Sequence, residues 1–283
     1  MDYLPLADLL AHARQHGYAV PSFCTWNAEV LEVVLQTAQR LQAPVIVMAG
    51  PVEFGLLRPR ILAPIARQLL DIYPVTAALH LDHGDTPEIV DDCLAAGFTS
   101  VMLDYSARSY QENVAALRAV VARAHPCGVS VEAEIGHVGR VDNISIEGER
   151  ASTFTEPADA AAFVEATGVD ALAISIGNAH GQYTHLPHFD FPRLAAIQHA
   201  TRIPLVLHGG SGTPDDELRQ AIELGIAKVN VATDLIAAVR SSLRTQWETG
   251  RNLWTPAALA EAVQAMVPAI ERWITRTGAK GQA

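Results

Sequence analysis

The chain has 283 residues, of which 49% are hydrophobic and 18% are charged, and its net charge is −11 at neutral pH. This composition suits a folded protein with a large core, and the length fits one α/β barrel as well as two smaller domains. The negative charge disfavours nucleic acid as a partner, and no apolar run reaches the roughly 18 residues that a membrane helix needs.

The N-terminal segment and the cysteines indicate the compartment. The first residues carry an early Asp2, no basic leader and no long apolar stretch, so they are typical of a short amphipathic helix and not of a signal peptide. Three cysteines, Cys24, Cys93 and Cys127, lack CxxC spacing and are expected to be reduced thiols. We therefore expect a cytoplasmic protein.

Short apolar runs rich in β-branched residues alternate with longer stretches of helical period along the chain. We predict strands at Ala19–Phe23, Pro44–Met48, Thr76–Leu81, Ser100–Leu103, Ser130–Ile135, Ala171–Ile176, Pro204–Leu207 and Ala227–Val231. The helical stretches between them include Ala28–Arg40, Pro87–Ala96, Gln111–Ala124, Pro157–Thr167 and Asp215–Leu224. Thr86 and Thr213 each precede a proline and an acid, which predicts an N-cap at both threonines.

Eight strands, each followed by a helix, favour a parallel sheet that closes into a (β/α)8 TIM barrel as a single domain over residues 1–283. An open doubly wound sheet is the alternative, but no GxGxxG follows the first strand. The long segment from Gly136 to Ser152 is typical of a mobile lid. The segment from Pro256 to Ile274 predicts extra helix after the eighth unit.

Histidines stand at the ends of the third, sixth and seventh strands, within HLDHG, AHG and HGGSG. Strand ends meet on one face of a barrel, so His83, His180 and His208 are expected to converge there as an open zinc site. A single histidine more often satisfies a local hydrogen bond, but three beside glycines favour a metal. His80, which shares a strand face with Asp82, is expected to be structural or to support the ligands from outside the metal site. His137, His185 and His188 are expected to be solvated or packing residues.

Two loops predict a phosphate site. The Gly209-Gly210-Ser211-Gly212 loop has little side-chain bulk, so its backbone N–H groups can approach an anion closely. The Asn230-Val231-Ala232-Thr233-Asp234 segment leads from the eighth strand into a helix, whose N-terminus favours negative charge. Loops after the seventh and eighth strands are the recurrent phosphate site of TIM barrels.

Taken in order, the motifs HLDHG, SVEAEIG, AHG, HGGSG and KVNVAT resemble those of the class II, metal-dependent fructose- and tagatose-bisphosphate aldolases. The NVAT form is similar to the tagatose-type branch, and the resemblance runs from the first strand to the eighth helix. It implies a lyase that cleaves a phosphorylated ketose to dihydroxyacetone phosphate and an aldehyde through a zinc-stabilised enediolate. It also implies a homodimer or homotetramer, one zinc ion and, as a further option, a monovalent cation.

The resemblance assigns roles to individual residues. His83, His180 and His208 would bind zinc, with Glu134 as an alternative ligand and Asp104 nearby. Asp82 would be the acid/base for the hydroxyl of the aldehyde half. The ketose phosphate would be held by Gly181, Gly209, Gly210, Ser211, Asn230, Ala232 and Thr233.

The chain also departs from the family pattern. Asp142 stands where the GGxED motif has its catalytic glutamate, and it would move the carbon-bound proton; Arg140 replaces a glycine, either as a solvated residue or as a partner for a carboxylate or second phosphate. Further departures are Cys24, Gly50, Tyr105, Ala107 and Asn178. Because these changes spare the metal and phosphate residues, they predict an altered aldehyde half.

Other chemistries remain open. A class I aldolase needs a Schiff-base lysine, and of the two lysines, Lys228 and Lys280, the first shares strand parity with Asn230 and could face the barrel interior. Three histidines favour the metal mechanism instead. An epimerase on the same scaffold and a sugar-phosphate-binding protein without turnover are further alternatives, although Asp82 beside the metal argues against the latter.

Overall fold

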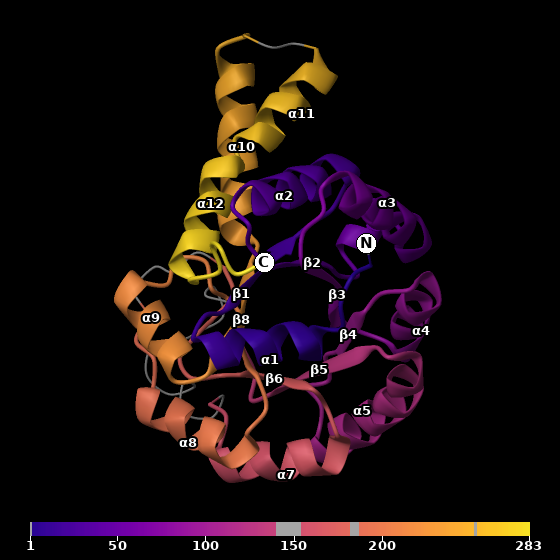
Figure 1. Cartoon of the computed structure of the whole chain (residues 1–283), viewed down its shortest axis with the longest axis vertical. Coiled ribbons are helices and arrows are strands. Elements are labelled where there is room, and N and C mark those ends of the chain that lie inside the picture. The colour runs from indigo at the N-terminus through magenta and orange to yellow at the C-terminus, as the bar shows by residue number, and fades with distance from the viewer. Residues whose placement is uncertain (1, 140–153, 182–186, 252–253) are drawn as a thin grey trace.

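The strands close into a parallel barrel (Figure 1), as predicted. The computed structural model describes residues 2–139, 154–181, 187–251 and 254–283. The strands are β1 (Val20–Cys24), β2 (Val45–Ala49), β3 (Ala77–Gly84), β4 (Ser100–Leu103), β5 (Ser130–Ile135), β6 (Ala171–Ile174), β7 (Leu205–Leu207) and β8 (Ile226–Val231). Each pairs in parallel with the next, and β8 pairs with β1, which closes the barrel.

Helices surround the barrel and pack their apolar faces against it. They are α1 (Leu6–His16), α2 (Ala28–Arg40), α3 (Pro59–Ile72), α4 (Pro87–Ala96), α5 (Tyr110–Ala124), α7 (Pro157–Thr167), α8 (Phe191–Thr201), α9 (Asp215–Glu223), α10 (Thr233–Glu248), α11 (Thr255–Gln264) and α12 (Val267–Arg276). Within the same described residues the chain forms two 3-10 turns, η1 (Glu53–Gly55) and η2 (His125–Cys127). None of the helices in these ranges is long and apolar enough to cross a membrane.

Helix starts follow the local sequence in most places. Thr86 accepts a hydrogen bond from the N–H of Ile89 and caps α4, as predicted. The predicted cap at Thr213 is wrong, because α9 begins one residue later with Pro214 at the N-cap. Thr213 is buried, and its hydroxyl has no hydrogen-bond partner among the described residues. Three acids in the first turn of α9 face the positive end of its dipole instead.

One end of the barrel is covered, which leaves the other for a site. Helix α1 crosses the N-terminal ends of the strands (Figure 1), where the N–H of Ala7 donates to the Ser130 hydroxyl at 3.0 Å and that of Leu4 to the Ala77 carbonyl at 2.8 Å. The carboxyl ends of the strands therefore form the face that can receive a ligand.

The barrel interior contains charged and polar side chains as well as apolar ones. Lys228 on β8 and Glu132 on β5 are fully buried and form an ion pair of 2.9 Å across the barrel. His80 on β3 is also fully buried and bonds the Ser100 hydroxyl at 2.8 Å. Separating a buried pair of this kind by removing one partner typically costs about 3–5 kcal/mol. These residues lie directly beneath the strand ends.

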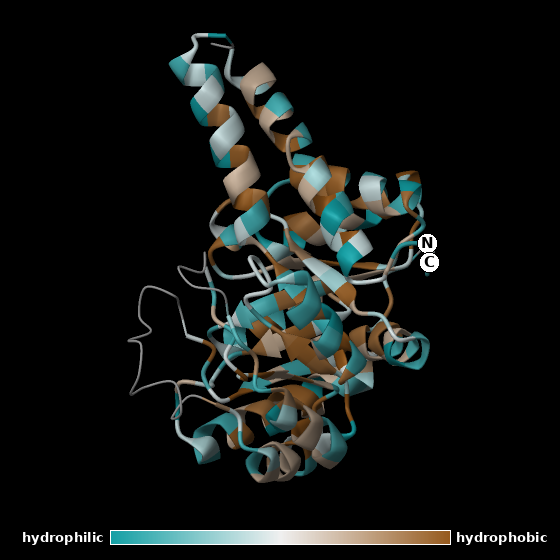
Figure 2. Ribbon diagram, turned by 90° about the vertical axis from the view of Figure 1, so that its left-hand side faces the viewer, coloured by the Kyte–Doolittle hydropathy of each residue, from teal (hydrophilic) through white to brown (hydrophobic). Residues whose placement is uncertain are grey.

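The predicted extra helix at the C-terminus is present as α11 and α12. Helices α10 and α11 pack against each other and project from the barrel as a two-helix arm (Figures 1 and 2). Helix α12 returns to the barrel, where Trp273 is fully buried.

Candidate active site

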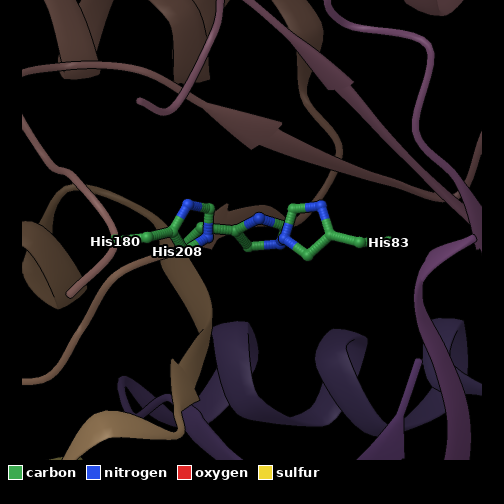
Figure 3. Close-up of side chains that lie close together, drawn as sticks. All are labelled: His83, His180 and His208. Carbon is green, nitrogen blue, oxygen red and sulfur yellow. The ribbon is translucent and has the colours of Figure 1, made fainter. Parts of the chain in front are cut away.

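Three imidazoles from different strand ends meet at the open end of the barrel. His83 comes from β3, His180 follows β6 and His208 follows β7, and we refer to them as the histidine triad. Their ring centroids lie 4.6–5.7 Å apart, and Figure 3 shows the rings turned toward one another. One nitrogen from each ring lies within 4.8 Å of the others, which is close enough for a single metal ion to contact all three.

A bulge in β3 turns His83 toward the triad. The pairing of β3 with β4 shifts register between Leu81 and Gly84, and His83 takes a positive φ of 44°. A bulge bends its strand and redirects side chains, and histidine tolerates this left-handed conformation better than bulky residues do. As a result, Asp82 and His83 both reach the mouth of the barrel although they are neighbours in sequence.

Each ring of the triad is held by one nitrogen. Nδ1 of His83 lies 2.7 Å from Oδ2 of Asp104, and Nδ1 of His180 lies 3.2 Å from the Val138 carbonyl. Nε2 of His208 lies 2.9 Å from Oε1 of Glu132. Because these partners accept hydrogen bonds, each held nitrogen carries the ring proton. When each ring carries only this one proton, as a metal ligand must, the lone pairs of the opposite nitrogens are directed into the space between the rings.

Several of the converging atoms are buried polar atoms with no hydrogen-bond partner among the described residues. They include Nε2 of His83, Nδ1 of His208 and Oε2 of Glu134. The last two are 3.1 Å apart without hydrogen-bond alignment. Leaving such atoms unpaired costs free energy, so their convergence fits a cation that all three would contact. Nitrogen and carboxylate donors suit zinc and other divalent first-row metals.

The charges of the site act on its titratable groups. Burial alone would lower the pKa of His208. The Glu132 and Glu134 carboxylates have the larger, opposite effect and raise this pKa to about 10. Burial and the charges of the other two triad rings lower the pKa of His180 to about 4. The two carboxylates therefore place negative charge beside His208, at one side of the triad.

Asp82 lies beside the triad and stays ionised at neutral pH. Burial alone would raise the pKa of Asp82. The nearby positive charges, chiefly those of His83 and Lys228, outweigh burial and lower this pKa to about 2. The Asn230 amide donates to Oδ1 of Asp82 at 2.8 Å, which fixes the carboxylate. Its side chain remains 18% exposed, so a ligand in the barrel mouth can reach it.

The predicted phosphate loops lie against one another. The N–H of Gly210 donates to the Asn230 carbonyl at 3.1 Å, and the Ser211 hydroxyl accepts from the N–H of Asp234 at 3.3 Å. The N–H of Gly210 is thus used within the protein, and in this arrangement it is not available to a phosphate. Ala232 and Thr233 follow at the start of α10.

Glycine is required at position 209 for packing. Its φ is 65°, and a Cβ there would lie 2.0 Å from the Ala179 carbonyl oxygen. The loop after β7 therefore fits tightly against the loop that carries His180, and Gly181 follows with a φ of 103°.

Some predicted site residues lie outside the described residues, and some functional neighbours were not predicted. Asp142, Arg140 and His185 fall in the undescribed ranges. Glu132, which holds His208, was not singled out from the sequence. A signal was available, because Glu132 has the same strand parity as Glu134 and would need a cation such as Lys228 inside the barrel.

Among the remaining histidines, His80 is buried and bonded to Ser100, as expected of a structural residue. His188 is exposed and bonds Glu217 at 2.9 Å, and His137 is exposed, in keeping with the expected solvated or packing roles.

Comparisons with known proteins agree with this geometry. Residues 5–282 match the profile of the family described as fructose-bisphosphate aldolase class-II. The chain is 31% identical to the YdjI aldolase from Escherichia coli K12, with a TM-score of 0.88 and 100% of each chain covered.

Two further solved structures are similar. A protein assigned as a fructose-1,6-biphosphate aldolase from Coccidioides immitis is 30% identical, with a TM-score of 0.87 over 98% of this chain and 97% of that one. A fructose-bisphosphate aldolase from Campylobacter jejuni is 22% identical, with a TM-score of 0.84 over 98% and 95%, which is a likeness of fold.

Proposed function

The chain belongs to the class II fructose-bisphosphate aldolase family, and from this membership we propose that it reversibly cleaves a phosphorylated ketose to dihydroxyacetone phosphate and an aldehyde. One divalent ion, which we propose to be zinc, would be held by the histidine triad. The observation that carries the proposal is that the triad brings one nitrogen of each ring within 4.8 Å of the others, while Nε2 of His83 and Nδ1 of His208 are buried with no hydrogen-bond partner among the described residues.

The triad and Glu134 would hold the ion. When bound, a divalent ion supplies Lewis-acid polarisation of the ketose oxygens and stabilises the negative charge of the enediolate. The protein contributes fixed ligands, because Asp104, Val138 and Glu132 already restrain the three rings. Such restraint lowers the cost of ordering the site when the ion and substrate bind.

Asp82 would move the proton of the hydroxyl on the aldehyde half. In the cleavage direction its ionised carboxylate accepts that proton as the carbon–carbon bond breaks, and in condensation it returns the proton. Asn230 orients the carboxylate through Oδ1, so the substrate hydroxyl would meet the other face of Asp82. Asp142 is proposed to move the carbon-bound proton on the dihydroxyacetone-phosphate half.

The ketose phosphate would lie against the loops after β6, β7 and β8. Gly209 and Ser211 belong to the loop after β7. The N-terminus of α10 at Thr233 offers the positive end of a helix dipole to the phosphate. Gly210 would contribute through its lack of a side chain, since its N–H is bonded to Asn230.

The aldehyde half is proposed to differ from that of fructose bisphosphate. Cys24 is buried at the end of β1, close enough to Asp82 and Glu53 for their charges to act on its thiol. Gly50 lies beside Asp82, and a Cβ at Gly50 would lie 2.6 Å from the Asp82 carbonyl oxygen. Cys24 and Gly50 both depart from the family pattern, so the surroundings of the acid/base Asp82 would differ from those in other family members. A place in the tagatose-type branch and use of a monovalent cation remain part of this proposal.

The geometry argues against a Schiff-base mechanism. A Schiff-base lysine needs a neutral amine that a carbonyl carbon can reach. Lys228 is fully buried, and its ammonium is bonded to both oxygens of Glu132 at 2.9 and 3.0 Å.

The test is a coupled assay for released dihydroxyacetone phosphate across ketose monophosphates and bisphosphates. We expect release from at least one of them, loss of activity with a chelator and recovery on adding zinc. Chelator-resistant activity with borohydride trapping would contradict the metal mechanism. Interconversion of epimers without carbon–carbon cleavage would instead indicate an epimerase.

A further inference from the structure

A buried ion pair lies directly beneath the histidine triad. Nζ of Lys228 is 3.0 Å from Oε1 and 2.9 Å from Oε2 of Glu132, and both side chains are fully buried. Oε1 of Glu132 is also 2.9 Å from Nε2 of His208. In the contacts described for this part of the chain, Lys228 reaches the triad through Glu132.

His208 lies between two carboxylates, one beside each ring nitrogen. Glu132 faces Nε2 at 2.9 Å, and Glu134 faces Nδ1 at 3.1 Å. A metal ligand needs a bare lone pair, so a proton on Nδ1 would prevent that nitrogen from binding the ion. The side that holds the proton therefore decides whether His208 can act as a ligand.

Lys228 also occupies the position of a second cation. Donor atoms of His80, Asp82 and Glu132 lie within 4.8 Å of one another, a cluster that could hold an ion by itself. Nζ of Lys228 is at hydrogen-bond distance from Glu132 and 3.5 Å from Nε2 of His80. The lysine thus supplies the positive charge of this cluster and fixes the Glu132 carboxylate, which in an ion pair can only accept hydrogen bonds.

We propose that Lys228 is a positioning residue for the metal site: its ammonium fixes Glu132, Glu132 holds the proton of His208 on Nε2, and Nδ1 of His208 is thereby presented to the ion. This inference rests on the proposed metal-dependent function. It assigns a role to a buried lysine outside the set of residues that would hold the ion.

The sign of the change in metal affinity tests the inference. Removing a positive charge near a divalent cation should tighten its binding if only electrostatics operates. If Lys228 positions Glu132, Lys228→Met should weaken binding instead, by about 10- to 100-fold, the usual effect of losing an outer partner of a metal-bound histidine. The double variant Lys228→Met/Glu132→Gln leaves the net charge of the site unchanged. In the Glu132→Gln background the two readings separate: electrostatics alone predicts that adding Lys228→Met tightens binding, whereas the positioning role predicts no further change, because Lys228 acts through Glu132.

The measurement is the affinity of the full chain for Co²⁺ and Zn²⁺ in competition with a chelator, with the visible Co²⁺ spectrum as a readout of the ligand field. Lys280→Met is the matched control, because it removes the other lysine, and it should bind both ions as the wild type does. Folding of every variant is checked by circular dichroism and thermal melting. Should Lys228→Met fail to fold, the comparison of the double variant with Glu132→Gln decides the question.

Weaker binding and an altered Co²⁺ spectrum in folded Lys228→Met, or equal affinity in the double variant and in Glu132→Gln, support the positioning role, whatever the aldolase assay shows. Wild-type affinity or tighter binding in Lys228→Met, or tighter binding in the double variant than in Glu132→Gln, overturns it, while the proposed function stands. A wild-type protein that binds no divalent ion overturns both.

Discussion

At the scale of single residues, the site depends on which atom of each ring is held and which is left bare. Asp104, the Val138 carbonyl and Glu132 each engage one nitrogen of the triad. A change to an outer partner should therefore alter ion affinity, whereas a change to Asp82 should alter proton transfer.

Asp82→Asn is expected to lower kcat by roughly 10²- to 10⁴-fold, since the amide cannot accept the hydroxyl proton. Ion affinity should change much less, because Asp82 is outside the triad. Asp85→Asn, an exposed change in the following turn, serves as the control and should keep wild-type kcat. A loss of ion binding equal to the loss of kcat would contradict the acid/base role.

His80 predicts a pH dependence of stability for the ion-free protein. Burial and the charge of Lys228 lower the pKa of His80 to about 3. Its unfolded pKa is about 6.5, so the unfolded state binds more protons between these values and stability is lost as the pH falls from about 6.5. The loss approaches about 1.4 kcal/mol per pH unit.

Urea unfolding of the chelated protein between about pH 6.5 and 4.5 measures this loss. His80→Gln should show a shallower slope than the wild type. The exposed change His199→Gln should leave the slope unchanged. Parallel slopes for wild type and His80→Gln would show that His80 is not the titrating group.

The sequence predicted the triad because three glycine-flanked histidines at the ends of barrel strands are typical of a metal site. It did not predict the atoms that hold the rings. Glu132 and Lys228 lie on strands β5 and β8, which are not neighbours in the barrel, and only closure of the barrel brings the two side chains together.

At the scale of elements, the strand predictions were accurate to a few residues except at the functional ends. The third strand was predicted as Thr76–Leu81, but β3 continues to Gly84 through the bulge that presents Asp82 and His83. A bulge adds residues without interrupting the strand, so an alternation pattern fails there. The predicted N-cap at Thr213 is wrong because Pro214 is itself the N-cap residue of α9, whereas the prediction made it the first residue of the helix.

The contact between the loops after β6 and β7 predicts the effect of Gly209→Ala. A positive φ alone costs an alanine about 1–2 kcal/mol, as at Gly128, where φ is 71° and an added Cβ meets nothing within 4 Å. Gly209→Ala should lose about 1–3 kcal/mol more, because its Cβ would overlap the Ala179 carbonyl. Chemical unfolding of both variants measures the difference.

Ion affinity separates the two glycine variants further. Gly209→Ala should weaken ion binding by displacing the loop that carries His180, whereas Gly128→Ala should not. Equal stability and equal ion affinity in the two variants would mean that the loops are not tightly coupled.

At the scale of the whole molecule, the arm of α10 and α11 projects away from the barrel (Figure 2). Trp247, Trp254 and Leu259 on or beside these helices are 57%, 73% and 48% exposed. Large apolar side chains exposed on one projecting arm often mark an interface, and we expect a second copy of the chain to cover them.

Light scattering on a sizing column should therefore give two or four times the chain mass of 30.4 kDa. Trp247→Glu/Leu259→Glu is expected to reduce the assembled fraction through desolvation of the new charges. Ile72→Glu, at an exposed apolar position of α3 away from the arm, should leave the mass unchanged. A monomeric wild type would contradict the predicted assembly.

Helix α1 covers one end of the barrel, and the histidine triad lies at the other. The central claim is that this triad holds a single divalent ion. Anomalous diffraction from crystals grown with Zn²⁺ or Co²⁺ tests that claim most directly. We predict one dominant peak within coordination distance of Nε2 of His83, Nε2 of His180 and Nδ1 of His208. An ordered triad with no peak between its rings, or a dominant peak elsewhere in the molecule, would contradict it.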